Sequence, residues 1–107
     1  MPVAQWDVYA NPIAASRVEV PYLVDAQSEL LHGVPTRFVV PLADPQRRMA
    51  GLPPRLVPNF DVMGRSLQLI PQEAGAVPAS LLGKPVANLR EQAHRIVDAL
   101  DTVISGV

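Results

Sequence analysis

The sequence has no cysteine, which excludes disulfide bonds, thiolate nucleophiles and the usual structural zinc sites. It has no excess of positive charge, because 9 Lys and Arg are balanced by 10 Asp and Glu, for a formal net charge of -1. Such a chain lacks the broad basic field that neutralises phosphates, so we expect nucleic acid not to be its primary partner. No apolar run is long enough to cross a bilayer, and the amino-terminal residues lack the features of a signal peptide. The sequence therefore predicts a soluble, cytoplasmic protein.

Catalytic groupings are also missing from the sequence. It shows no nucleophile paired with a base, no metal-ligand cluster and no glycine-rich phosphate loop. The two histidines are His32, beside a turn, and His94, on a polar helix face, and residues in such places are usually solvated. Asp25 and Glu29 fall where a strand gives way to a loop, so we interpret them as fold-supporting or solvated carboxylates. We expect a protein that is not an enzyme and that needs no cofactor and no metal.

The length of the chain limits its organisation. With 107 residues there is room for one domain, residues 1–107, around one hydrophobic core. Hydrophobic residues make up 49% of the sequence, which is rich for so small a domain. We therefore expect part of the apolar surface to lie in a homo-oligomer interface.

Short, proline-punctuated segments favour a mainly β fold. The 12 prolines are spread along most of the chain and separate short elements. Alternation and β-branched content predict strands at residues 6–9, 20–27 and 37–42, with Pro41 at a sheet edge, a bulge or a strand end. Residues 43–55 form a long connection, and residues 57–62 and 65–70 flank Met63-Gly64 as a tight hairpin.

The last element is predicted to be an amphipathic helix. Asn88 suits its N-cap, and Glu91, three positions later, completes a capping-box pattern. Glu91 also stands four positions before Arg95, in the favourable order for an ion pair on a helix. Residues 105–107 are expected to extend beyond the helix end. Apolar residues at helical spacing predict a face that packs on a sheet, made of Leu89, Ala93, Ile96, Val97, Leu100, Val103 and Ile104.

One basic cluster leaves a catalytic alternative open. Arg47 and Arg48 are adjacent in a polar loop, and Arg55 follows. Small β-barrel ribonucleases use arginines to stabilise charge on the phosphate that is cleaved. Adjacent arginines in a loop are usually only solvated, so this hypothesis is the weaker one.

Several segments resemble the CcdB family of toxins, in the same order along nearly the whole chain. Residues 24–31 read Val-Asp-Ala-Gln-Ser-Glu-Leu-Leu, where the family has Val-Asp-Val-Gln-Ser-Asp followed by two large aliphatic residues. Residues 37–42, Arg-Phe-Val-Val-Pro-Leu, resemble a family strand that ends in Ile-Pro-Leu. Residues 77–83, Val-Pro-Ala-Ser-Leu-Leu-Gly, resemble the family's Val-Pro-Val-Ser-Val-Ile-Gly, and Val-Ala-Asn-Leu follows at 86–89.

The resemblance implies a fold and a set of partners. The fold would be an SH3-like small barrel of the kind shared by the CcdB and MazF toxins. It would have a five-stranded antiparallel sheet, a small accessory sheet and a carboxy-terminal helix, and would assemble as a symmetric homodimer. The protein would be the toxin of a type II toxin–antitoxin system, neutralised by a CcdA-like antitoxin. Its target would be the A subunit of DNA gyrase, which it traps on cleaved DNA.

The resemblance also implies which residues contact gyrase. The family ends in Phe-Trp-Gly-Ile, and the matching positions here are Ile104, Ser105, Gly106 and Val107. Ser105 removes a large aromatic, and a buried aromatic anchor contributes about 2–4 kcal/mol to an interface. Leu30 and Leu31 match a pair of isoleucines that supports this contact, and Asp101 matches an asparagine with the same role. Taken by themselves, Leu30 and Leu31 fit a core and an interface equally well.

Two other functions remain open at this point. The chain could be a diverged member of the family that no longer poisons gyrase, since Ser105 departs from the family pattern. It could also be a MazF-like ribonuclease toxin that uses Arg47, Arg48 or Arg55.

Overall fold

The computed structural model describes residues 4–46 and 57–106 of the chain. The loop arginines Arg47, Arg48 and Arg55, and the last residue, Val107, lie outside these residues. The described elements are strands β1 (Asp7–Ala10), β2 (Tyr22–Asp25), β3 (Thr36–Ala43), β4 (Asn59–Val62), β5 (Arg65–Leu69), β6 (Gly75–Pro78) and β7 (Ala87–Asn88), and helix α1 (Ala93–Ser105).

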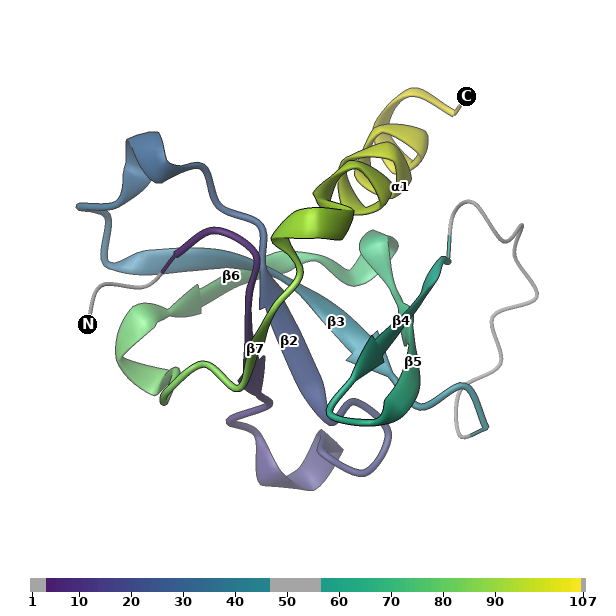
Figure 1. Cartoon of the computed structure of the whole chain (residues 1–107). Helices are drawn as coiled ribbons and strands as arrows, with labels where there is room; N and C mark the ends of the chain where they lie inside the picture. The colour runs from purple at the N-terminus through teal and green to yellow at the C-terminus, as the bar shows by residue number, and fades with distance from the viewer. Residues whose placement is uncertain (1–3, 47–56, 107) are drawn as a thin grey trace.

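The predicted fold class is confirmed: the chain is mainly β, with a nearly closed, barrel-like antiparallel sheet and one carboxy-terminal helix (Figure 1). Five strands lie side by side in the order β6-β3-β2-β1-β7. The hairpin of β4 and β5 joins them through a short pairing of β5 with Leu42 and Ala43 of β3. The accessory sheet implied by the family resemblance is therefore this hairpin, which continues the main sheet. Strands β6 and β7 were not expected from the sequence.

Pro41 lies inside β3, where the sequence allowed an edge, a bulge or a strand end. The strand continues to Ala43, and Pro41 is paired with Leu23 of β2. On its other side, β3 pairs with β6 up to residue 39 and with β5 from residue 42. The nitrogen of Pro41 lies on this second side, at the point where β3 changes from β6 to β5. No strand is paired with residue 41 there, so the missing N–H of proline does not interrupt the ladder. Its carbonyl still accepts the Ile70 N–H at 2.9 Å.

The predicted hairpin at Met63-Gly64 is confirmed. Val62 pairs with Arg65, which leaves a two-residue loop whose members have φ values of 52° and 80°. Positive φ at both loop positions is the type I′ geometry that matches the twist of the flanking strands. Gly64 adopts this conformation without steric cost.

The helix begins later than its sequence signals predicted. Residues Arg90–Gln92 form a 3₁₀ turn, and α1 begins at Ala93. The Asn88 side chain accepts the N–H of Arg90, the first residue of the 3₁₀ turn, at 2.8 Å, so it does not cap the α-helix. The pairing of Arg95 with Glu91 is replaced by other contacts: Arg95 donates to the Gln92 side chain at 2.6 Å and to the Asn59 carbonyl at 2.7 Å.

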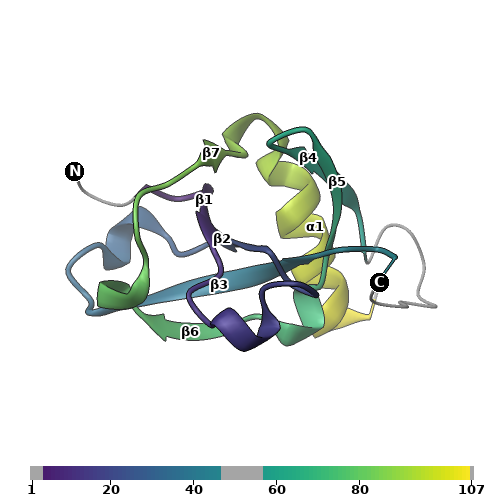
Figure 2. The same cartoon turned by 90° about the horizontal axis from the view of Figure 1, so that it is seen from below.

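The sheet is covered on both faces. Seen from below, α1 lies between the strands β1 to β3 and the hairpin of β4 and β5 (Figure 2). Ile96 and Ala99 of α1 are fully buried there against the larger core, which includes Val24, Val40 and Leu67. The other face of the sheet packs a smaller core: Val20, Leu23, Val39, Ala43 and Ile70, with Val77 and Leu82 against it.

Candidate protein-binding surface

The aliphatic pair Leu30 and Leu31 lies on a solvent-exposed turn. Residues Glu29–Leu31 form a 3₁₀ turn, η2, in which the Ser28 hydroxyl accepts the Leu30 N–H at 3.2 Å. The two leucines are therefore part of a turn and not of an extended strand. Leu30 is 91% exposed and Leu31 is 50% exposed, so neither belongs to the core of the described chain.

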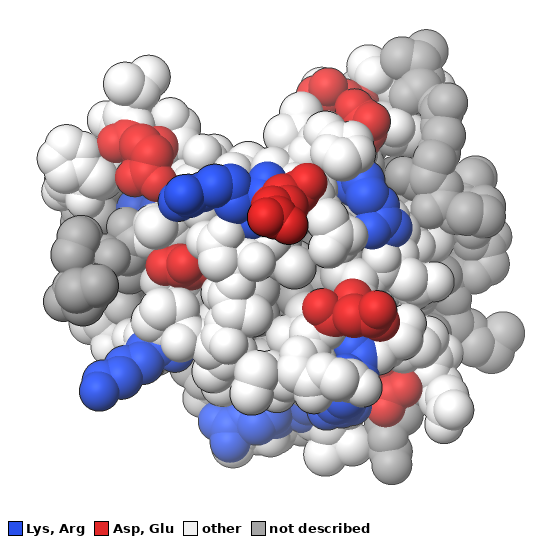
Figure 3. Space-filling model, in the orientation of Figure 1, with Lys and Arg blue, Asp and Glu red and all other residues white. Residues whose placement is uncertain are grey.

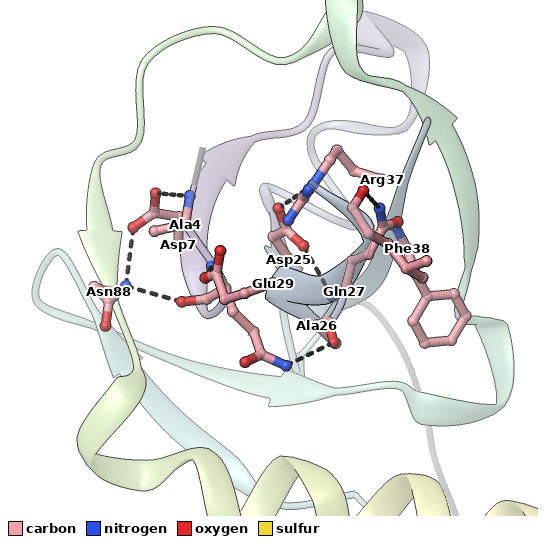
Figure 4. A network of polar contacts seen from close by, with 11 residues as sticks. Ala4, Asp7, Asp25, Ala26, Gln27, Glu29, Arg37, Phe38 and Asn88 are labelled. Atoms are coloured by element: carbon pink, nitrogen blue, oxygen red, sulfur yellow. Dashed lines mark hydrogen bonds and ion pairs between the residues drawn. The ribbon is translucent and has the colours of Figure 1, made fainter. Parts of the chain in front are cut away.

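A buried polar network lies directly under this turn (Figure 4). Asp25 and Arg37 are both fully buried, and the Arg37 Nε donates to an Asp25 carboxylate oxygen at 2.6 Å. The other Asp25 oxygen accepts the N–H of Gln27 at 2.9 Å. The interpretation of Asp25 as a fold-supporting carboxylate is confirmed. Glu29 is exposed, and its carboxylate accepts the Gln5 N–H at 2.7 Å.

Tyr9, on the neighbouring strand, is held in its neutral form. Burial raises the pKa of Tyr9 to about 12, and the carboxylates of Asp7 and Asp25 add to the effect. An acid whose folded-state pKa lies above its unfolded value of about 10 contributes stability that is complete below pH 10 and lost between pH 10 and 12. This hydroxyl therefore stays protonated near neutral pH.

Ser105 belongs to α1, which corrects for this residue the expectation that residues 105–107 extend beyond the helix end. Ser105 is the last residue of the helix, and its hydroxyl donates to the Asp101 carbonyl at 2.7 Å. Gly106 ends the helix with φ 76°, and its N–H donates to the Thr102 carbonyl at 2.9 Å. Left-handed backbone after a helix favours glycine, which explains the residue at this position.

The apolar stripe of the helix is only partly covered, which also departs from the sequence-based prediction. Ile96 and Ala99 are buried, whereas Val97 is 42% exposed, Val103 is 43% exposed and Ile104 is 85% exposed. Helical spacing places Val97, Asp101 and Ile104 next to one another on one flank. Sequence reasoning assigned Val97 to the core, because periodicity identifies an apolar stripe but not how much of it a neighbour covers.

The predicted contact residues form two groups that lie apart in one chain. Asp101, Ile104, Ser105 and Gly106 are together at the end of α1, and Leu30 and Leu31 are on η2. Figures 1 and 2 show the two elements on different sides of the molecule. In the space-filling view their segments form two projections with a notch between them (Figure 3). A partner that contacts both groups of one chain must therefore span this notch.

The titratable residues of the described chain are spread over its surface and core. They contain no group of three or more His, Asp or Glu that could hold a metal ion. His32 and His94 are exposed, as expected. On the face drawn in Figure 3, positive and negative side chains are interspersed, so there is no continuous basic area. Among residues 4–46 and 57–106, no helix has the length and apolarity to cross a membrane.

One apolar depression lies elsewhere on the molecule. It has a volume of about 370 Å³, and Ile13, Val20, Val39, Val77 and Leu81 are among its lining residues. None of the residues predicted to contact gyrase lines it.

These features define a small, mainly β protein whose exposed aliphatic residues suit the binding of another protein. The family model described as CcdB protein matches residues 5–106 of the chain. The chain therefore belongs to the CcdB family, and it is a toxin of a toxin–antitoxin system.

Proposed function

We propose that this protein is a homodimeric, single-domain, non-enzymatic toxin that binds the A subunit of DNA gyrase and traps its complex with cleaved DNA. A CcdA-like antitoxin neutralises it in the cytoplasm. Contact with gyrase is made by Leu30 and Leu31 on η2 and by Asp101, Ile104, Ser105, Gly106 and Val107 at the end of α1. We add Val97, which shares the exposed flank of the helix with Asp101 and Ile104.

The exposure of large aliphatic side chains on two projecting elements carries this proposal. Leu30 is 91% exposed and Ile104 is 85% exposed, whereas other leucines and isoleucines of the chain, such as Leu67 and Ile96, are fully buried in the core. Exposed apolar side chains grouped in this way mark protein interaction sites. Membership of the CcdB family supports DNA gyrase as the target of these positions.

The decisive experiment is regulated expression in two bacterial strains that differ only in whether gyrase A carries an allele resistant to this family. We expect growth arrest in the sensitive strain and normal growth in the resistant strain. Co-expression of the CcdA-like antitoxin should restore growth in the sensitive strain. Arrest in both strains, with RNA cleavage that disappears in Arg47→Ala, would instead support the ribonuclease alternative. Normal growth of both strains would support a diverged member of the family that no longer poisons gyrase.

Two isoleucines of α1 allow the effect of a substitution on gyrase binding to be distinguished from its effect on folding. We expect Ile104→Ala to leave the melting temperature unchanged and to weaken binding to the gyrase A dimerisation fragment about tenfold, because a buried isoleucine contributes about 1.5 kcal/mol or more to an interface. The same substitution at the buried Ile96 should lower the free energy of unfolding by about 2–5 kcal/mol. Calorimetric titration and thermal unfolding measure both effects. Unchanged binding by Ile104→Ala would exclude this helix flank from the interface.

A further inference from the structure

The packing of its own aliphatic side chains accounts for only part of the orientation of η2. Leu30 is almost fully exposed and Leu31 is half exposed. Within the turn, the Leu31 N–H donates to the Ser28 carbonyl at 3.0 Å and the His32 N–H donates to the Glu29 carbonyl at 3.2 Å. These bonds shape the turn but do not attach it to the sheet. Single 3₁₀ turns are also weak, because their hydrogen-bond geometry is poor.

Gln27 provides an attachment between the turn and the sheet. Its side chain is buried, and its Oε1 accepts the N–H of Phe38 in β3 at 2.8 Å (Figure 4). Its Nε2 donates to the carbonyl of Leu31 at 3.1 Å. Its own N–H is held by Asp25, which is fixed in turn by the ion pair with Arg37. One amide group therefore connects β3 to the exposed turn.

We propose that Gln27 is a positioning residue that holds η2, with Leu30 and Leu31, in the orientation required for contact with the target. This inference rests on the proposed function for its target, gyrase A. The role requires an acceptor and a donor on the same planar group, which an amide provides. An ionised carboxylate at this position still accepts the N–H of Phe38. Its second oxygen cannot donate to the Leu31 carbonyl, so that hydrogen bond is lost. A protonated carboxyl group restores the donor.

The test is the pH dependence of binding by Gln27→Glu. We measure its dissociation constant for the gyrase A dimerisation fragment relative to that of the natural protein, at about pH 8 and about pH 5. At pH 8 we expect binding about tenfold weaker than that of the natural protein. At pH 5 the ratio should approach one, because burial and the nearby Asp25 carboxylate favour the protonated form of the new side chain. Arg37, Glu29 and His32 also lie near the turn, but they are present in both proteins, so the ratio isolates the effect of residue 27.

Hydrogen exchange gives a second readout that does not depend on gyrase. The His32 and Val34 amides donate within the turn, at 3.2 Å and 3.1 Å, and both should exchange faster in Gln27→Glu at pH 8 than in the natural protein. The matched control is Gln46→Glu, which makes the same charge change at an exposed position and should alter neither measurement. Ser28→Ala removes the cap of the same turn from a partly exposed position, so it should weaken binding without endangering the fold.

The outcomes separate the two proposals. Natural protein that binds no gyrase fragment would overturn the proposed function, and exchange of the turn amides would then decide the role of Gln27. Binding and exchange in Gln27→Glu that match the natural protein at pH 8 would overturn the positioning role. A loss of binding that is equal at both pH values would also overturn it, because the lost donor would then not be the cause.

Discussion

Replacing Asp25 by alanine is expected to lower the free energy of unfolding by about 3–5 kcal/mol, which is a large share of the stability of a domain of this size. The substitution leaves the guanidinium of Arg37 charged and fully buried, without the carboxylate at 2.6 Å. It also removes the acceptor of the Gln27 N–H. Urea unfolding, followed by circular dichroism, measures the loss.

The double variant Asp25→Leu with Arg37→Met is the control for this prediction. Replacing both partners of a buried ion pair by apolar residues of similar size is often neutral or stabilising, because no charge is left buried. We therefore expect the double variant to be more stable than Asp25→Ala, although the Gln27 N–H still lacks its acceptor. A loss in Asp25→Ala of less than about 1 kcal/mol would show that the pair contributes little to this fold.

Introducing tryptophan at residue 105 is expected to strengthen gyrase binding by about thirty- to a thousandfold, which corresponds to the 2–4 kcal/mol of an aromatic anchor. Ser105 is exposed in the last turn of α1, and its hydroxyl donates to a backbone carbonyl of the helix, so it presents little to a partner. A Ser105→Trp side chain would project from the same turn as Ile104. The measurement is affinity for the gyrase A fragment, together with the yield of cleaved complex.

A tryptophan elsewhere on the helix controls for added apolar surface. Asp98 is exposed and lies seven positions before residue 105, on nearly the same side of α1. Because Asp98 lies about two turns, or ~10 Å, before the end of the helix, Asp98→Trp should strengthen gyrase binding much less than Ser105→Trp. Deletion of residues 105–107 should abolish poisoning and keep the fold, because the buried helix residues Ile96 and Ala99 come earlier. Antitoxin binding should partly survive, since a disordered partner wraps a wider surface. Tight binding that is the same in all these forms would exclude the helix end from the interface.

The sequence predicted the elements whose signals are local. Strand β3, the hairpin at Met63-Gly64 and the amphipathic helix all follow from residue types within a few positions. Strands β6 and β7 were missed, because Gly75–Pro78 and Ala87–Asn88 are short and are defined by their partners β3 and β1. The start of α1 was misplaced, because the Asn88 side chain accepts an N–H of the 3₁₀ turn that precedes the helix.

The candidate site depended on the family resemblance more than on local signals. Exposure is a property of the whole fold, so two adjacent leucines before a turn did not reveal whether they are core or surface. The same limit applies to Val97, whose position fits the apolar face of the helix but whose side chain is only partly buried. The network around Asp25, Arg37 and Gln27 was also hidden, because its members come from different strands and turns and meet only in the folded chain.

The exposed end of α1 has a consequence for the evolution of this protein. Ile104 and Ser105 add little buried surface, so substitutions there change the free energy of unfolding by little. Under the proposed function, selection on these positions acts through target recognition, whereas mutations at Asp25 or Ile96 are selected first for their effect on folding. The helix end can thus accumulate changes and acquire a new specificity on an unchanged scaffold. Serine in place of an aromatic at residue 105 is a change that this architecture tolerates.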